Sequence, residues 1–416
     1  MDIVQKLHGL LLGESKKIRD WIELHLTKVR LPIYSSHDIR NSGFKVAPVD
    51  ANLFPGGFNN LCKNSKKMSA SYFAEYIAKD FTNAKKILII AEEHTRNKFY
   101  LENLFSLKSI LEAAGFQIRI GVLKGDFDES RCFETAEKNE IKIYKIQIRD
   151  NKASVKDFVP DIIIDNNDFT EGEPVALKSI IQPIVPQIDL GWFRRKKSNH
   201  FRIYNQLIEE FSLSFNIDKW FLSEFYDYVD DIDFKTGKGF EEVGDKIGKV
   251  ITLIKKKYEE YDIKEKPFVF VKNNAGTYGM AIMNAENGRD FTNMNRATRN
   301  KMSFGKGKTP VESLIIQEGV PTIDKVDGYV AEPLIYLIGE KPVGGFFRLN
   351  TKRTTKENLN TRGMSFESDN LCPMNSDSFG KNVRSNVSSE NIKIYKFISL
   401  ISTITQGYEI AELSKI

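Results

Sequence analysis

The sequence predicts an α/β fold, because strand-like and helix-like segments alternate along its first half. Four short apolar segments have the composition of buried strands: residues 85–97, 117–122, 141–148 and 161–165. Segments 69–80 and 100–114, which precede the first two of these, have the pattern of helices. Strands and helices in this order favour an open α/β sheet, and polar residues at 91–97 and 164–168 mark the edge where such sheets bind ligands.

The remaining chain predicts helices at its start and middle and strands near its end. Residues 1–30 have the period of one amphipathic helix, and residues 34–61 are rich in polar residues, glycine and proline. Residues 199–262 are mainly helical, with a surface loop at 227–239 and a helix at 243–261. From residue 266 the pattern changes to strands, at 268–271, 314–317, 329–338 and 342–349. A GEKP turn joins the last two and predicts a hairpin.

Composition excludes several classes of protein. The chain has 416 residues and a formal net charge of +5, with no basic tail of the kind that nucleic-acid binders carry. It has no signal segment and no 18-residue apolar run, so we expect a cytoplasmic protein without a membrane partner. Its three cysteines, Cys62, Cys132 and Cys372, are far apart and form no CxxC pair, which indicates neither a zinc site nor a disulfide framework.

The segment from residue 268 to 280 carries the clearest chemical signal. A short apolar strand leads to Lys272 and then to a loop of small residues with Gly276, Thr277, Tyr278 and Gly279. Glycine lets backbone N–H groups approach phosphate oxygens, and a lysine adds a positive charge, so the segment is typical of an ATP phosphate loop. The pattern alone leaves open a plain hairpin or β-bulge.

A second apolar strand, at residues 313–320, ends in Gln317, Glu318, Gly319 and Val320. Next to a phosphate loop, such a segment can line the adenine ring, with the acidic side chain accepting from the ribose. An ordinary strand end has the same pattern.

Asp50 and Asn52 form a candidate metal pair. They are two residues apart in an extended stretch, which puts both side chains on one face of a strand. A carboxylate and an amide oxygen suit Mg²⁺, which completes its shell with water and phosphate. An Asx-turn ahead of Pro55 is the alternative.

Basic and polar side chains gather at three predicted loops: His37, Asp38, Arg40 and Asn41; His94, Thr95, Arg96 and Asn97; and Arg194, Arg195, Lys196, Ser198 and His200. A later strand carries Arg348 and Asn350 on one face, ahead of a loop rich in Asn, Thr and Gly. Arginine binds carboxylates and phosphates through two donors, so these positions suit an amino-acid substrate. A solvated surface and a hairpin are the alternatives.

Taken together, these segments resemble the proteobacterial-type glutamate–cysteine ligase family, which has ATP-grasp relatives. The resemblance covers about residues 33–371, in IRNSGFKVAPVDANLFPGGFNNL, AEEHTRNKFY, IIIDNNDF, QPIVPQIDLGWFRRKKSNHF, VKNNAGTYGMAI, IIQEGV, AEPLIYLI and VGGFFRLNT. It implies an ATP-grasp-like fold with an open α/β substrate-binding domain. It also implies that ATP and Mg²⁺ serve to join L-glutamate to L-cysteine through an acylphosphate. We therefore expect a substrate- and metal-binding region at 1–198, a helical connection at 199–265 and a nucleotide-binding region at 266–416.

A more distant similarity to eukaryotic-type glutathione synthetases implies roles for individual residues. The same order of arginine, metal pair, lysine loop, hinge and late arginine strand occurs here. The implied catalytic residues are Arg40, Lys272 and Arg348. Nucleotide binding falls to Lys272, Gly276, Thr277, Tyr278, Gly279, Gln317, Glu318 and Val320. Substrate binding falls to Arg40, Asn41, Arg96, Asn97, Arg194, Arg348, Asn350 and Asn358.

The implied metal ligands are Asp50, Asn52 and Glu332. The glycine-rich loop of the synthetases contains an acidic residue that residues 273–278 lack, and Glu332 is the candidate replacement. Two other functions stay open: an ATP-grasp ligase for a different amino acid or peptide, and a nucleotide-binding regulator without activity. The oligomeric state, a homo-oligomer included, is not fixed by the sequence.

Overall fold

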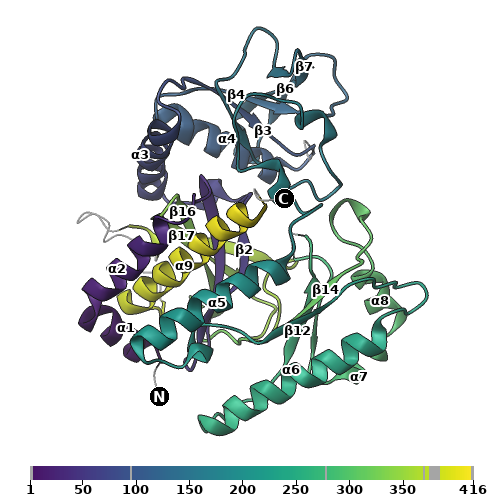
Figure 1. Cartoon of the computed structure of the whole chain (residues 1–416). Helices are drawn as coiled ribbons and strands as arrows, with labels where there is room; N and C mark the ends of the chain where they lie inside the picture. Colours follow the sequence, from purple (N-terminus) through teal and green to yellow (C-terminus); the bar gives the residue numbers. More distant parts are fainter. Residues whose placement is uncertain (1–2, 94–95, 277–278, 369–370, 374–384, 414–416) are drawn as a thin grey trace.

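The computed structural model describes residues 3–93, 96–276, 279–368, 371–373 and 385–413. Thr277 and Tyr278, like His94 and Thr95, lie outside these residues. Figure 1 shows three sheets, with the parallel one at one end of the molecule and a layer of helices beside the other two.

The predicted open sheet is present, and its core strands are parallel. Its order is β10–β9–β3–β4–β6–β5, with only β5 antiparallel to its neighbour. The strands are β3 (Lys86–Ile90), β4 (Gln117–Val122), β5 (Ser130–Glu134), β6 (Glu140–Lys145), β9 (Ile162–Asp165) and β10 (Ile184–Val185). Helices α3 (Lys63–Asp80) and α4 (Lys98–Ala113) pack on each other beside it, and β7 (Gln147–Arg149) pairs with β8 (Lys152–Ser154). Residues 141–148, expected as one strand, therefore belong to two.

A second, antiparallel sheet joins the start of the chain to its end. Its order is β18–β17–β16–β1–β2, and β15 also pairs with β16. We call it the site sheet; its strands are β1 (Tyr34–Asn41), β2 (Val46–Asn52), β15 (Lys325–Val326), β16 (Tyr329–Ile338), β17 (Lys341–Asn350) and β18 (Met364–Glu367). The β16–β17 hairpin confirms the predicted one. Residues 34–61 contain two strands: β2 covers the extended stretch expected around Asp50 and Asn52, whereas β1 covers residues 37–41, which were expected to lie in a loop.

The third sheet is antiparallel and carries Lys272. Its order is β11–β14–β12–β13, from β11 (Tyr226–Val229), β12 (Val269–Asn273), β13 (Ile282–Ala285) and β14 (Leu314–Glu318). Helix α6 (Phe240–Glu260) packs on it, and α7 (Gly288–Thr292) and α8 (Arg296–Met302) follow β13. The mixed α/β class is thus confirmed. The division at residues 198 and 265 stays a prediction, because strands from all three regions pair with one another.

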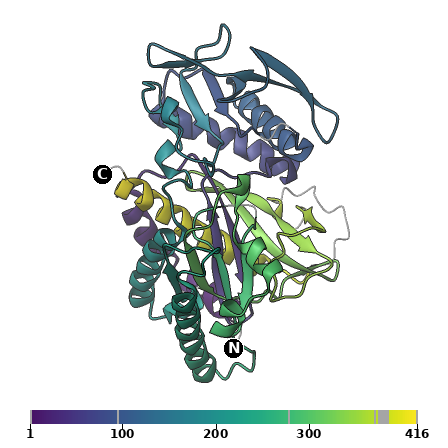
Figure 2. The same cartoon turned by 90° about the vertical axis from the view of Figure 1, so that its right-hand side faces the viewer.

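The helical layer contains α1 (Ile3–Gly13), α2 (Ser15–Leu26), α5 (Lys197–Phe215) and α9 (Ser389–Leu413). The single helix expected at residues 1–30 is therefore two helices. Helix α9, which the sequence did not predict, packs across β1, β2 and β16 and against α5 (Figure 1). Figure 2 shows the same helices from the side, alongside the site sheet. No helix in the described part of the chain is long and apolar enough to cross a membrane.

A disulfide joins Cys62, at the start of α3, to Cys372. This corrects the expectation from cysteine spacing, because the two residues are 310 positions apart in sequence and no local motif marks them. The bond ties the segment after β18 to the helix beside the parallel sheet.

Candidate active site

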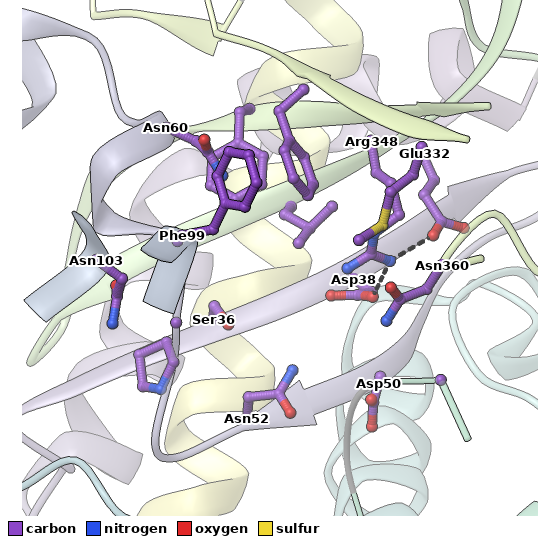
Figure 3. Close-up of a pocket in the computed structure, with 18 of the residues that line it drawn as sticks. Ser36, Asp38, Asp50, Asn52, Asn60, Phe99, Asn103, Glu332, Arg348 and Asn360 are labelled. Carbon is purple, nitrogen blue, oxygen red and sulfur yellow. Dashed lines mark hydrogen bonds and ion pairs between the residues drawn. The ribbon is translucent and has the colours of Figure 1, made fainter. Parts of the chain in front are cut away.

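A cavity of about 730 Å³ opens between the site sheet, the third sheet and the start of helix α4 beside the parallel sheet. Its polar wall comes from alternate residues of β1 and β2, from β12 and from the β16–β17 hairpin. Its apolar wall includes Phe99, Tyr336, Phe346 and Phe366. Figure 3 shows Asp38, Glu332 and Arg348 close together at one end, Phe99 at the other, and Asp50 with Asn52 along the neighbouring strand.

Two arginines share one glutamate at the polar end. Arg348 donates from Nη1 to Asp38 Oδ2 at 2.7 Å and to Glu332 Oε1 at 2.6 Å. Arg40 Nε donates to the other oxygen, Glu332 Oε2, at 2.9 Å. Burial alone would raise the pKa of Glu332, but the two guanidinium groups outweigh it and lower that pKa. Both oxygens of this carboxylate are therefore occupied by arginines, which does not suit the metal-binding role expected for Glu332.

Arg40 also contacts two segments beside the cavity. Its guanidinium donates to the backbone oxygen of Val320 at 3.2 Å and to that of Glu357 at 2.7 Å. The first follows β14, and the second lies in the Asn- and Thr-rich loop after β17. Since its donors serve the protein itself, Arg40 holds this loop in place beside the cavity.

Asp50 and Asn52 face the cavity from β2, as their spacing predicts. Asp50 Oδ1 accepts from Lys197 Nζ, at the start of α5, and from the Ala51 N–H at 3.1 Å. Burial acts to raise the pKa of Asp50, but Lys197 and Lys272 lower it further than burial raises it. The carboxylate is therefore held ionised between two ammonium groups.

The backbone of Ala51, between Asp50 and Asn52, is held by buried side chains on the side away from the cavity. Arg195 Nη1 donates to the Ala51 oxygen at 2.9 Å. The same guanidinium contacts both oxygens of Glu409, on α9, at 3.0 Å each. His200 Nδ1 lies 2.9 Å from Glu409 Oε2. All three side chains are buried, so α9 and α5 together support the edge of β2 that carries Asp50.

Lys272 reaches the cavity from β12. Its Nζ donates to Gln317 Oε1 at 2.7 Å and to the Val49 oxygen at 3.0 Å, and burial lowers its pKa. Gly276 and Gly279, at the two ends of the following loop, also line the cavity. Gly279 has φ +66°, and a Cβ there would lie 2.8 Å from the Asn360 oxygen, so only glycine fits. Gly279 thus approaches the segment after β17 closely.

Gln317 and Glu318 lie behind the cavity wall. Gln317 Nε2 donates to Glu224, whose pKa burial raises to about 8. Glu318 pairs with the buried Lys45 at 2.7 Å and accepts from Trp220 Nε1 at 2.9 Å. The carboxylate of Glu318 is therefore used within the fold, and it does not face the cavity as a ribose contact would.

The other predicted residues divide into two groups. Asn97 and Asn358 line the cavity; Asn97 also caps α4, and Asn358 Nδ2 donates to the Gly279 oxygen at 3.3 Å. The rest have other surroundings. Asn41 donates to Tyr395 at 2.9 Å, and Asn350 donates to the Leu359 oxygen at 3.2 Å. Arg194 pairs with Asp189 at 3.0 Å. Arg96 is exposed, and Val320 is buried.

Sequence reasoning assigned no specific role to two residues that the structure places in the cavity wall. Asp38 belongs to a row of alternating side chains on β1, with Ser36 and Arg40, and a period of two could have indicated it. Lys197 is the last member of a run of four basic residues, and no pattern in the sequence separates it from the half-exposed Lys196.

Comparison with known proteins gives two matches that cover nearly the whole chain. Residues 9–410 match the family described as GshA, glutamate-cysteine ligase. A solved structure of a candidate γ-glutamylcysteine synthetase from Methylobacillus flagellatus KT is 33% identical, covers 99% of this chain and 97% of its own, and has a TM-score of 0.88. No curated protein matches the chain.

Two other solved structures are much less similar. D-alanyl-alanine synthetase A from Vibrio cholerae O1 biovar eltor str. N16961 is 9% identical over 78% of this chain and 81% of its own, with a TM-score of 0.35. A glutathione synthetase-like effector, GSS30, from Globodera pallida is 12% identical over 88% of this chain and 81% of its own, with a TM-score of 0.38. Similarity at this level supports no conclusion about the site.

Proposed function

The chain belongs to the glutamate–cysteine ligase family, and from this premise we propose how its cavity joins L-glutamate to L-cysteine. As a member of that family it is a ligase that uses ATP. In the proposed reaction, the γ-phosphoryl group of ATP passes to the γ-carboxylate of glutamate and leaves ADP and an acylphosphate. The cysteine amine then attacks the acyl carbon and loses a proton to solvent. The bond from that carbon to phosphate breaks, which releases γ-glutamylcysteine and phosphate.

The observation that carries this proposal is the meeting of Lys272, Lys197 and Asp50 in one cavity. Phosphoryl transfer to a carboxylate brings two anions together, so positive groups fixed in a poorly solvated site are the main requirement. Lys272 Nζ is buried and donates to Gln317, and the buried Lys197 donates from Nζ to Asp50. These two ammonium groups are the proposed partners of the transferred phosphoryl group.

We propose that Asp50 and Asn52 hold Mg²⁺ with the nucleotide. Both side chains carry hard oxygen donors on the cavity face of β2, which is the chemistry Mg²⁺ prefers. Among the described residues, no group of three or more His, Cys, Asp or Glu side chains is arranged to hold a metal ion. A site with few protein ligands is usual for Mg²⁺ bound with phosphates, where the ion supplies charge neutralisation.

For the nucleotide, we propose that Gly276 and Gly279 lie beside the phosphates and that the base rests on β12 and β13. Phe270 and Ile282 line the cavity on that sheet and offer an apolar surface. Gln317 contributes indirectly, because it accepts from Lys272 and fixes the position of the ammonium group. Glu318 and Glu332 are left out of the ligand set, since their oxygens are taken up by Lys45 and by arginines.

The test is phosphate release from ATP with glutamate alone, cysteine alone or both, with the product identified by its mass. We expect γ-glutamylcysteine only when both amino acids are present. Lys272→Ala should lower turnover by about 10²- to 10³-fold, which is the usual effect of removing one fixed group that stabilises transition-state charge. Lys264→Ala, at a lysine whose side chain is 82% exposed, is the matched control and should leave turnover unchanged.

Two outcomes would contradict the proposal in different ways. Turnover that requires another acid or amine would show a ligase for different substrates. ATP binding without turnover under any combination of amino acids would favour a regulator.

A further inference from the structure

The ion pair between Asp38 and Arg348 leaves two polar atoms without a partner. Asp38 Oδ1 and Arg348 Nε are both buried, and neither has a hydrogen-bond partner among the described residues. Each residue is 8% exposed and lines the cavity. An unsatisfied buried polar atom is costly, above all on a charged group, so the wall of the cavity offers one acceptor and one donor to a ligand.

The α-carbon of an amino acid carries the matching pair of groups. An ammonium group donates and suits Asp38 Oδ1, while a carboxylate accepts and suits Arg348 Nε. A purely anionic ligand fits less well, because Asp38 lies close to the carboxylates of Glu332 and Asp50. Burial, and to a smaller extent these two neighbours, raise the pKa of Asp38, so a cation arriving at Oδ1 also stabilises its ionised form.

The position of Asp38 in the sheet indicates which amino acid it binds. Asp38 on β1 pairs directly with Asp50 on β2, and neighbouring strands are only about 4.8 Å apart. A glutamate with its α-carbon groups at Asp38 and Arg348 can therefore extend its two methylenes towards Asp50 and Lys272, where the phosphoryl group is transferred. Cysteine does not fit this role, because its amine must be free and unprotonated to attack the acyl carbon.

We propose that Asp38 binds the α-ammonium group of the glutamate substrate and, with Arg348 on the α-carboxylate, selects an α-amino acid over a plain dicarboxylic acid. This inference rests on the proposed function and assigns the part of the same cavity that binds glutamate. Glu332 contacts the same arginine, but each of its oxygens already accepts from a guanidinium group, so it is a weaker acceptor for the ammonium than the unpaired Asp38 Oδ1. Glu332 is therefore the matched position that affects Arg348 without contacting the substrate amine.

The experiment compares glutamate with glutarate, which keeps both carboxylates and lacks only the α-amino group. Wild-type protein should use glutamate about 10- to 100-fold better than glutarate in kcat/KM, the range expected for a hydrogen bond to a charged group. Asp38→Asn should lower kcat/KM for glutamate by a similar factor and leave that for glutarate nearly unchanged. Glu332→Gln should lower both together.

Three results would overturn the inference. Equal losses for both substrates in Asp38→Asn would mean that Asp38 only positions Arg348. If Asp38→Asn keeps the wild-type preference for glutamate, Asp38 has no role in selection. If the wild-type protein uses the two substrates equally well, the ammonium is not recognised, and this result requires no variant. Calorimetry measures the binding of glutamate to the wild-type protein and to Asp38→Asn independently of turnover. If the wild-type protein does not bind glutamate, both proposals are wrong. If the wild type is active and Asp38→Asn binds and uses glutamate equally well, only this inference is wrong.

Discussion

Strand β3 of the parallel sheet and strand β1 of the site sheet are both buried but are built from different chemistry. Residues 87–90 of β3 are isoleucine and leucine with no exposed surface. All eight residues of β1 are also buried, yet most of them are polar or charged. On β3, burial is itself the stabilising event, because apolar surface leaves water. On β1, burial is unfavourable until each polar side chain has a partner.

Those partners come from elements far away in the sequence. His37 Nε2 lies 2.9 Å from Thr403 Oγ1 on α9, Asn41 donates to Tyr395 on the same helix, and Arg40 pairs with Glu332 on β16. The comparison teaches that the parallel sheet depends on volume and shape, whereas the site sheet depends on matched charges. A small apolar change should therefore affect only stability in the first, while the loss of one charged partner should strongly destabilise the second.

The largest effect is expected when the Arg195–Glu409 pair behind β2 is broken. Arg195→Ala leaves a buried carboxylate without its cation, which costs about 3–5 kcal/mol in the free energy of unfolding. The control is Lys219→Ala, which breaks a pair with Glu209 whose side chains are 48% and 55% exposed. That change should cost less than about 1 kcal/mol. Urea unfolding of both variants measures the difference, and equal shifts would mean that the buried network does not support the site sheet.

The same network predicts a loss of stability in acid. Burial would raise the pKa of Glu409, but Arg195 and His200 lower it from 4.5 to about 2. A carboxyl group with a lowered folded pKa contributes stability that is fully present above its unfolded pKa. The contribution, about 3 kcal/mol, is lost as the pH falls from about 4.5 towards 2.

Glu409→Gln isolates this contribution. The variant is less stable near neutral pH, and its unfolding free energy should fall less steeply than that of wild type below about pH 5. Parallel slopes for the two proteins would show that Glu409 does not have a lowered pKa in the folded state.

The contrast between the two sheets also explains what the sequence could predict. Continuous apolar runs predicted β3, β4 and β9 close to their observed positions, because no partner is needed to bury them. Strand β1 was not predicted, because a polar strand has the composition of a loop when its partners are unknown. Helix α9 was missed for a related reason: Ile394, Ile398 and Ile401 recur at helical spacing, but the polar Ser399, Thr403 and Gln406 are buried as well, so no separate polar face marks the helix.

The site was predictable to the extent that its residues follow a local rule. Asp50 and Asn52 share a face because strands have a period of two, and Lys272 was indicated by the strand and glycines around it. The run 194–197 shows the limit. Arg195 and Lys197 turn inwards to Glu409 and Asp50, while Arg194 and Lys196 pair with the more exposed Asp189 and Asp230. Four adjacent basic residues give no signal for this alternation until the tertiary structure is known.

The smallest effect is expected in the parallel sheet. Ile89→Val removes one methylene from a fully buried strand and should lower the free energy of unfolding by about 0.5–1.5 kcal/mol. Because β3 is stabilised by apolar packing and Ile89 does not line the cavity, kcat and KM for glutamate, cysteine and ATP should match those of wild type. Urea unfolding and steady-state kinetics on the same preparation measure both. A change in KM for glutamate at unchanged stability would mean that the packing of the parallel sheet is coupled to the charged wall of the cavity, and that the two sheets do not differ as proposed.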